Sequence, residues 1–467
     1  SSGSGSGSSG SSSFAYANDK VSVGTDHSCA IVDNGELKCW GNDYYGQLGN
    51  GGSSTSPINA PSSTAIDLGT GRTAVTVFAG WRHNCAILDN GDLKCWGYDH
   101  SGQLGDGGTN THVHAPSSTA IDLGTGRTAV AVSAGELHTC AILDNGDLKC
   151  WGRDNHGQLG DGGSNTDTTA PSSTAIDLGT GRTAVAVSAG ELHACAILDN
   201  GDLICWGRDN HGQLGNGETI TGAQTSPPST AIDLGTGRTA VAVSAGSYHT
   251  CAILDNGDMK CWGRDNAGQL GIAGSSSDIT APSSTAIDLG TGRTAVAVSA
   301  GHEHTCAILD NGDLKCWGRD SDGQLGNGGS NTNTNAPSTA IDLGTGRTAI
   351  AVSAGYKHTC AIVDNGAMKC WGDNYQGALG NGGNTDQTSP VAVSGSNTWD
   401  SSTGASSGSG GGMTDVTNAM SCVATPSLPA GLNIDSSTCT ISGTPTAEAV
   451  NATYEINATI SGITYLA

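Results

Sequence analysis

Short apolar runs, each bounded by glycine or by a polar turn, follow one another along most of the chain without helical periodicity. Two of these runs, TAVAVSAG and HTCAIL, consist of β-branched and small apolar residues, and a third, DLKCWG, follows the second after a DNG turn. A fourth, STAIDLG, comes after a loop rich in Gly, Asn, Ser and Thr. This pattern predicts four strands, apolar on both faces, as expected for sheets that pack between two neighbours.

The same block of four predicted strands is repeated along the chain. Its central stretch, HTCAILDNGDLKCWGRD, recurs with small changes at 138–154, 193–209, 249–265 and 304–320, and more divergent copies begin at His27, His83 and His358. The first cysteines of successive copies are 54 to 56 residues apart. Seven four-stranded units of this length predict an all-β fold, a seven-bladed β-propeller over residues 21–394. A linear β-solenoid is the alternative, but its coils are typically shorter.

The repeat also carries a family pattern. Its consensus, AG-x-x-H-[ST]-C-A-[IL]-x-D-N-G-x-[LM]-K-C-W-G followed by GQLG, resembles the regulator-of-chromosome-condensation repeat, above all in its cysteine-bearing, secreted prokaryotic form. The resemblance covers about 21–394 and implies the propeller rather than an activity. The name-giving member of that family exchanges nucleotide on a small GTPase and sits on chromatin, and another secreted relative inhibits β-lactamases through its propeller face. The near-identity of the blades departs from the family and leaves less room for one distinctive protein-binding surface.

Two cysteines in each repeat are ten residues apart, on either side of the DNG turn. In the first copy, a three-residue loop ending in a left-handed glycine pairs residue 32 with residue 36, and so Cys29 with Cys39. The two side chains then face each other across adjacent strands, at a separation that suits a disulfide of roughly 2–3 kcal/mol. The predicted bridges are Cys29–Cys39, Cys85–Cys95, Cys140–Cys150, Cys195–Cys205, Cys251–Cys261, Cys306–Cys316 and Cys360–Cys370.

The repeated residues also have competing interpretations. His27 precedes Cys29 on the same strand face, so these two and Cys39 are a candidate metal cluster, but the usual zinc spacing and a fourth ligand are missing. Because a histidine stands at this place in every copy, we interpret it as a buried, hydrogen-bonded residue. We interpret the tryptophan after the second cysteine as packing between blades rather than as a platform for stacking carbohydrate. Calcium binding by loops such as GRDNHGQLGDGG is a weaker alternative, because they match no known coordination pattern.

Composition and charge narrow the class of protein. The net charge is −24 over 467 residues with only 19 lysines and arginines, so we expect neither nucleic acid nor a membrane surface as a partner. The 16 cysteines are typical of a secreted protein, extracellular or at the cell surface. No apolar stretch reaches the roughly 20 residues that span a bilayer. Because the chain opens on Ser1, we expect a mature or trimmed product.

The two ends of the chain differ from the repeats. Residues 1–20 form a Ser/Gly-rich tail that includes one short apolar stretch, Phe14–Ala17, suited to act as a donor strand. Residues 395–412 are rich in serine and glycine and are predicted to be a linker.

The last segment, 413–467, resembles the immunoglobulin-like modules of bacterial and archaeal surface proteins. Cys422 and Cys439 are its expected bridge, and Asn451 and Asn457 stand in N-glycosylation patterns. The module has fewer predicted strands than a full sandwich, so an unpaired edge is expected to accept a strand from another chain. The predicted strands are Ala419–Ala424, Leu432–Ile434, Thr438–Ile441, Ala452–Ile460 and Ile463–Leu466.

No G-x-S-x-G, paired-carboxylate or P-loop arrangement is present, so the sequence predicts no catalytic site, no metal site and no cofactor. The first functional hypothesis is a secreted structural glycoprotein, a filament or surface-fibre subunit that self-associates by strand addition. The alternative is a secreted module that binds a protein or a glycan through the propeller face. Blade-specific departures at Trp81 and Arg82, at 218–221 and at Ile272 favour the alternative.

Overall fold

The computed structural model describes residues 20–399, except 109–110, 164, 275–276, 330, 338 and 396 and the side chains of 220–222. Beyond residue 400 it describes the backbone of five strands. The chain divides into two compact units, Ser1–Ala405 and Ser406–Ala467, and each is described by itself.

Seven small antiparallel sheets, one for each repeat, build the first unit and are numbered blades 1 to 7 in chain order. The turn between the second and third strands has the predicted register: in blade 1, Val32 N donates to Glu36 O (2.8 Å) and Gly35 adopts a φ of 80°. The strands of the seven blades are β1 (Val21–Val23), β2 (His27–Ile31), β3 (Leu37–Asp43) and β4 (Ser54–Ile58); β5 (Ala74–Ala79), β6 (His83–Leu88) and β7 (Leu93–Gly97); β8 (Ala129–Ala134), β9 (His138–Leu143) and β10 (Leu148–Gly152); β11 (Ala184–Ala189), β12 (His193–Leu198), β13 (Leu203–Asp209) and β14 (Ile220–Gln224); β15 (Ala240–Ala245), β16 (His249–Leu254) and β17 (Met259–Gly263); β18 (Ala295–Ala300), β19 (His304–Leu309) and β20 (Leu314–Gly318); and β21 (Ala349–Ala354), β22 (His358–Val363), β23 (Met368–Gly372) and β24 (Gln387–Ala392).

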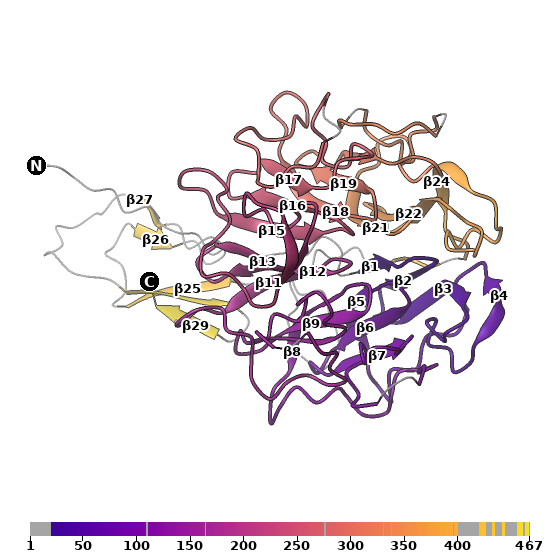
Figure 1. The fold of residues 1–467 in the computed structure, drawn as a ribbon, viewed down its shortest axis with the longest axis horizontal. Helices are drawn as coiled ribbons and strands as arrows, with labels where there is room; N and C mark the ends of the chain where they lie inside the picture. Colours follow the sequence, from indigo (N-terminus) through magenta and orange to yellow (C-terminus); the bar gives the residue numbers. More distant parts are fainter. Residues whose placement is uncertain are drawn as a thin grey trace, which may run out of the picture. The chain divides into compact units, whose positions relative to one another are not determined.

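The blades are arranged around a common axis, which confirms the predicted seven-bladed β-propeller (Figure 1). The first strand of each blade is innermost: β1 contacts β5, and the contacts continue through β8, β11, β15 and β18 to β21, which returns to β1. Every residue of the second strands is buried, because one face packs on the preceding blade and the other on the following blade.

The prediction of STAIDLG as the fourth strand is wrong. The loop before it takes the fourth position, as β4, β14 and β24 in three blades and as single bridges in the other four. The segment is nevertheless buried, since Ile66 N donates to Leu37 O (2.9 Å) and the side chain of Leu68 lies in the core. Lys94 Nζ binds Leu68 O (2.9 Å), and the chain then turns at Gly69. STAIDLG therefore fills the core without extending the sheet.

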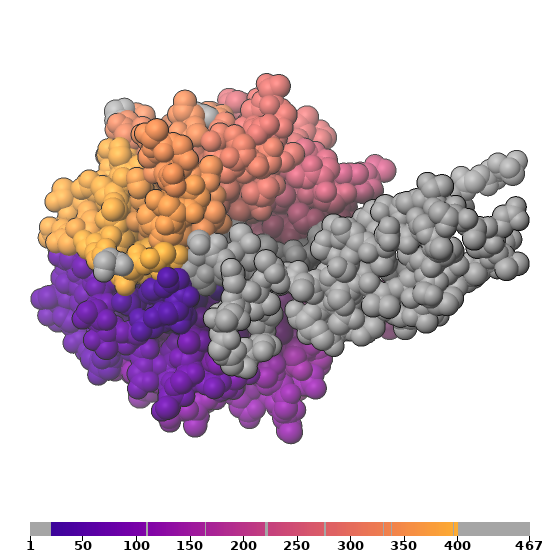
Figure 2. Space-filling view, turned by 180° about the vertical axis from the view of Figure 1, so that it is seen from behind, coloured from indigo at the N-terminus to yellow at the C-terminus, as the bar shows by residue number. Residues whose placement is uncertain are grey.

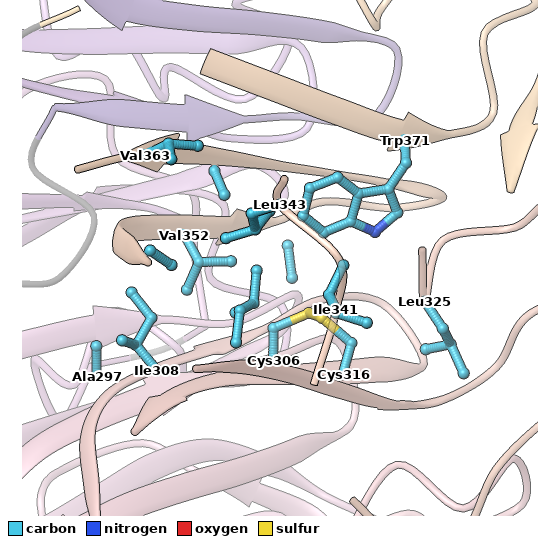
Figure 3. Packing of buried hydrophobic residues seen from close by; sticks show 14 residues of the cluster. Ala297, Cys306, Ile308, Cys316, Leu325, Ile341, Leu343, Val352, Val363 and Trp371 are labelled. Atoms are coloured by element: carbon cyan, nitrogen blue, oxygen red, sulfur yellow. A yellow bond between two sulfur atoms is a disulfide. The ribbon is translucent and has the colours of Figure 1, made fainter. Parts of the chain in front are cut away.

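Each disulfide packs against the tryptophan of the next blade. Figure 3 shows the Cys306–Cys316 bridge of blade 6 close to Trp371 of blade 7. The Nε1 of Trp371 also donates to Gln324 O of blade 6 (2.9 Å). The arrangement recurs at every junction, including the last to the first, where Cys360–Cys370 packs on Trp40. Because these tryptophans are completely buried, their interpretation as packing between blades is confirmed.

The repeated histidine also joins neighbouring blades. All seven are completely buried, and in six blades Nε2 hydrogen-bonds a side chain of the next blade, as His83 does with Thr139 Oγ1 (3.0 Å). His138 is the exception, because the next blade has Ala194 at the position of that threonine. Within the described part of the chain, no side chain hydrogen-bonds the ring of His138, and the backbone of His193 is the polar group that acts on it. The predicted role therefore holds in full for six of the seven histidines.

Ala194→Thr is expected to stabilise the protein by about 1 kcal/mol, because its hydroxyl would supply the side-chain partner that the buried Nε2 of His138 lacks. Equilibrium unfolding of the variant and the wild-type protein measures the difference. Thr139→Ala is the reverse change in the preceding pair of blades: it removes the bond to His83 together with the bond that Thr139 Oγ1 donates to Gln103 O (2.9 Å), and it is expected to destabilise the protein by at least a similar amount. Equal stabilities of Ala194→Thr and the wild-type protein would contradict the expectation.

Residues from both ends of the propeller close the ring. β1 has only three residues, and Trp399 occupies the place of the first residue of the other inner strands, in an antiparallel bridge with Val32. Trp399 N donates to Gly366 O (2.9 Å), and Asp33 N donates to Thr398 O (3.0 Å). Figure 2 shows the last blade, in orange, directly beside the first, in indigo. The propeller therefore extends to Trp399, past the start of the predicted linker.

The second unit contains a three-stranded sheet, β25-β28-β29, and a two-stranded sheet, β26-β27. Cys439 and Asn451 lie outside the described residues, and only the backbone is described for Cys422 and Asn457. The expected bridge and the glycosylation sites therefore remain predictions, as does the donor strand Phe14–Ala17, which also lies outside the described residues. The strands lie within three residues of the predicted segments: β25 (Met420–Thr425), β26 (Leu432–Ile434), β27 (Ile441–Gly443), β28 (Glu455–Ile460) and β29 (Ile463–Leu466).

Candidate binding face at the mouth of the central channel

The loops between the first and second strands of the seven blades surround one end of the central channel. Each loop begins with a glycine that lies against the corresponding glycine of the next blade; a Cβ at Gly80 would come 2.5 Å from Gly135 O. The residue after the glycine also donates its N–H to the next blade in most of the loops, as Glu191 does to Gly246 O (3.3 Å). A close approach that only glycine permits thus holds the loop backbones in one ring.

The two residues after each of these glycines vary among the blades, with the same pair, Glu-Leu, only in blades 3 and 4, whereas the strands beside them are nearly constant. The first position holds Thr25, Trp81, Glu136, Glu191, Ser247, His302 and Tyr356; the second holds Asp26, Arg82, Leu137, Leu192, Tyr248, Glu303 and Lys357. These residues, with the adjoining loops that follow the third strands, are called the variable face. The opposite end repeats the same Asp-Asn-Gly turn in all blades and six Arg–Asp pairs such as Arg72–Asp89 (3.2 Å).

A funnel of about 230 Å³ lies at the centre of the variable face, walled by the ring glycines and the residues beside them. Its two acidic side chains, Glu136 and Glu191, come from adjacent blades. The pKa of Glu136 is raised to about 7, mainly by burial and to a smaller extent by the charge of Glu191. Tyr248 Oη donates to Glu191 Oε1 (2.5 Å), and burial together with this bond raises the pKa of Tyr248. The funnel therefore presents two neighbouring carboxyl groups whose charges disfavour each other.

Blades 1 and 2 place a cluster of aromatic rings beside the funnel, here called the aromatic shelf. Neighbouring rings lie 4.8–5.0 Å apart between centroids, in edge-on and stacked arrangements that fix one another. The guanidinium of Arg82 lies over Tyr45 and Trp81, with Cζ 5.0 and 4.5 Å from the ring centroids. Arg82 Nη1 also donates to Tyr45 Oη (3.1 Å). The members of the shelf are Tyr44, Tyr45, Trp81, Tyr98 and His112.

Blades 3 to 6 carry arginines where blade 2 has Tyr98. Arg319 Nη1 lies 2.6 Å from Glu303 Oε2, and Arg264 Nη1 lies 3.4 Å from Oε1 of the same carboxylate. Burial alone would raise the pKa of Glu303, but the bond from Arg319 and the neighbouring cations lower it overall. Arg208 and Arg264 also lie over the ring of Tyr248. The variable face is therefore aromatic over blades 1 and 2 and charged over blades 3 to 6.

The predicted cysteine partners lie together in every blade. All seven pairs are disulfides with Cα atoms 4.0–4.1 Å apart. The candidate metal cluster is therefore a Cys29–Cys39 bridge beside His27, whose Nε2 hydrogen-bonds Asn84 Oδ1 (2.9 Å). Among the residues that the structure describes, no group of three His, Cys, Asp or Glu side chains is placed to hold a metal ion.

The three blade-specific departures lie in different places. Trp81 and Arg82 are on the variable face. Trp81 belongs to both the wall of the funnel and the aromatic shelf, and Arg82 lies over the rings of the shelf. The loop 218–221 runs into β14 at the outer edge of blade 4, and Ile272 packs against the core between two blades.

Sequence reasoning does not single out the main polar residues of the funnel, Glu136, Glu191 and Tyr248. The signal was available, because the consensus contains two unspecified positions between AG and the histidine. Variation at two adjacent positions inside a nearly constant part of the repeat indicates residues that the common packing between blades does not fix.

Comparisons with known proteins agree on the fold. The RCC1-like domain model matches residues 110–414, the regulator of chromosome condensation (RCC1) repeat matches 19–47, 34–87 and 74–103, and the putative Ig domain matches 382–464.

Two curated relatives illustrate how much of such proteins the chain covers. The ultraviolet-B receptor UVR8 of Arabidopsis thaliana is 31% identical over 69% of this chain and 70% of its own length. The human E3 ubiquitin-protein ligase HERC2 is 28% identical over 76% of this chain, which spans 7% of the ligase.

Two solved structures share the propeller. Human WBSCR16 superposes with a TM-score of 0.66 at 20% identity, over 76% of this chain and 94% of that one. Yeast RCC1 (Prp20), solved bound to Kap60, gives a TM-score of 0.67 at 19% identity, over 84% and 90%. At these identities the likeness concerns the fold.

Proposed function

The chain belongs to the RCC1-like propeller family, and from this we propose that it is an extracellular binding module that recognises a partner protein through its variable face. The observation that carries the proposal is the contrast between the two ends of the propeller. One end repeats the same groups in every blade, whereas the other presents different side chains from a backbone ring held by hydrogen bonds between blades. Different side chains on a rigid support are typical of a recognition surface.

The chemistry of the variable face favours a protein as the partner. Tryptophan, tyrosine and arginine dominate the energetics of protein interfaces. The aromatic shelf and Arg82, which lies over it, combine all three. One relative is consistent with this class of partner: yeast RCC1 (Prp20) was solved bound to Kap60, and a second structure of it was described with its binding to Gsp1p and histones. A polyanion is a poor partner for a chain of net charge −24.

The seven disulfides support an extracellular setting, because such bridges persist in oxidising compartments. In the part of the chain that the structure describes, no helix is long and apolar enough to cross a membrane. The proposal contains no catalytic step. The match to the ligase covers 7% of that protein, so its activity is not carried over to this chain.

The fibre hypothesis rests on segments other than the variable face. The sequence alone predicts its donor strand, Phe14–Ala17. For its acceptor module, 413–467, the structure adds the backbone of five strands. We keep it as the second candidate, because the sequence predicts fewer strands in this module than a full sandwich has, and an unpaired strand edge is suited to strand addition.

Affinity capture from the extracellular fraction of the source culture tests the binding function. We expect the wild-type protein to retain a partner protein that the double variant Trp81→Ala/Arg82→Ala loses. The matched control is Arg72→Ala/Arg127→Ala, which removes two arginines from the constant end and is expected to retain the same partner. Equal capture by all three proteins, or loss with the control alone, would contradict a binding function of the variable face.

A further inference from the structure

The funnel holds two carboxyl groups, Glu136 and Glu191, that form no ion pair in the described part of the chain. Among the described residues, no ion pair within 4.0 Å joins Glu136 or Glu191 to an arginine or lysine, whereas Glu303 on the same face has two arginine partners. The groups that face Glu136 are the carboxylate of Glu191 and the guanidinium groups of Arg82, Arg153 and Arg208. These arginines lower the pKa of Glu136 less than burial and Glu191 raise it. The carboxyl groups of the funnel therefore have no directly paired cation, and the three arginines act on Glu136 only from a longer distance.

Aromatic rings complete the wall of the funnel. Trp81 stands next to Glu136 in blade order, and Tyr248 donates its hydroxyl to Glu191. On the other side of the ring, His302 and Tyr356 lie 4.0 Å apart between ring centroids. A cavity that combines aromatic faces with carboxylates suits a cation with an apolar stem, because the faces attract it and the carboxylates neutralise it.

We propose that the funnel receives the side chain of a lysine or arginine presented by the partner protein. The inference rests on the proposed function and names the chemistry recognised at its centre. The cationic head lies between Glu136 and Glu191, and its aliphatic stem packs against Trp81. A chain of net charge −24 also attracts a basic segment over a distance, so encounter and docking favour the same kind of partner.

Titration with the peptides acetyl-Gly-Gly-Arg-Gly-Gly-amide and acetyl-Gly-Gly-Gln-Gly-Gly-amide tests the inference directly. Binding of the full-length protein is measured by calorimetry and by the change in tryptophan fluorescence. Because the repeated tryptophans are buried, the change is expected to come from Trp81, which lines the funnel. We expect the arginine peptide to bind at least tenfold more tightly than the glutamine peptide. Glu136→Gln/Glu191→Gln is expected to abolish this preference, whereas Glu36→Gln, the same change at an exposed site in a turn of the constant end, is expected to keep it.

The pH dependence supplies a second readout. With a pKa of about 7, Glu136 is mostly neutral at pH 6 and ionised at pH 8, so affinity for the arginine peptide is expected to rise up to about tenfold over this range. Glu136→Gln is expected to remove most of that rise.

Equal binding of the two peptides, or a preference that survives in Glu136→Gln/Glu191→Gln, would overturn the inference. The proposed function would still stand if the variable face captured a partner in the preceding experiment. A thermal unfolding midpoint of the double variant equal to that of the wild-type protein shows that its loss of binding is not a loss of folding.

Discussion

Lowering the pH from 7 to 4.5 is expected to destabilise the propeller by several kcal/mol, because its seven buried histidines resist protonation in the folded state. Burial lowers the pKa of each of them from 6.5 to about 3 or 4. The unfolded chain takes up these protons near pH 6.5 and the folded protein does not. The contribution to stability is therefore complete above pH 6.5 and is lost as the pH falls towards 4, roughly 2 kcal/mol for each histidine at pH 5.

Buried carboxyl groups oppose this trend. Burial raises the pKa of Asp99 to about 7 and of Asp154 to about 6, and that of Glu136 to about 7, so the folded protein binds these protons before the unfolded chain does. Their contribution to the stability of the folded protein grows as the pH falls below 7 for Asp99 and Glu136 and below 6 for Asp154. At pH 5.5 the seven unfolded histidines hold about six protons, whereas the three folded carboxyl groups hold about three. The histidines therefore determine the sign of the change in stability, and four further aspartates whose pKa values burial raises reduce its size: Asp26, Asp43, Asp320 and Asp373.

The contribution of one histidine can be isolated at His138. His138→Asn removes a group whose folded-state pKa of about 4 lies below pH 5.5, and among the described residues it breaks no hydrogen bond to another side chain. We expect the slope of unfolding free energy against pH near pH 5.5 to fall by about one proton, measured by denaturant unfolding across a pH series. Stability that does not vary between pH 4.5 and 7 would contradict the account.

The repeat made most of the fold predictable. Because seven copies share one pattern, a single hairpin prediction extends to all blades, and the register around Gly35 followed from the DNG turn alone. The fourth strand failed for a reason that the local pattern does not contain. STAIDLG has the composition of a strand, but Leu68 O accepts Lys94 Nζ, from a strand of the next repeat. The lysine that binds the end of the STAIDLG segment is thus 26 residues away in the sequence.

The candidate site was less predictable, because its residues meet only around the ring. Glu136 and Glu191 are one repeat apart, and each alone is an ordinary polar residue in a loop. Their proximity follows once the blades are ordered around an axis, and only then do the unspecified positions of the consensus become one surface. Trp81 and Arg82 are visible in the sequence as departures from the repeat, but the stacking of Arg82 on Tyr45 depends on a loop of another blade.

Trp399→Ala is expected to destabilise the propeller by about 3–5 kcal/mol, because the ring closes on this side chain. Trp399 is 2% exposed and packs on Trp40 of blade 1, with ring centroids 5.5 Å apart. Asn397 Oδ1 accepts Lys38 Nζ (3.0 Å), which replaces the lysine-to-carbonyl bond of blades 2, 3, 5 and 6. Denaturant unfolding followed by tryptophan fluorescence measures the loss. Trp81→Ala, the same substitution at a partly exposed ring on the variable face, is the matched control and is expected to cost far less.

Deleting residues 1–17 distinguishes this closure from one made by the N-terminal tail. The inner strand of blade 1 is already complete in the described residues: Val21–Val23 supply one part, and Trp399 supplies the position that pairs with Val32. The deletion leaves every one of these contacts in place, so we expect the unfolding midpoint to stay within error of the wild-type value. A large loss of stability on deletion, with Trp399→Ala neutral, would instead assign closure to Phe14–Ala17. If both changes are neutral, the junction between the last and first blades does not limit the stability of the ring.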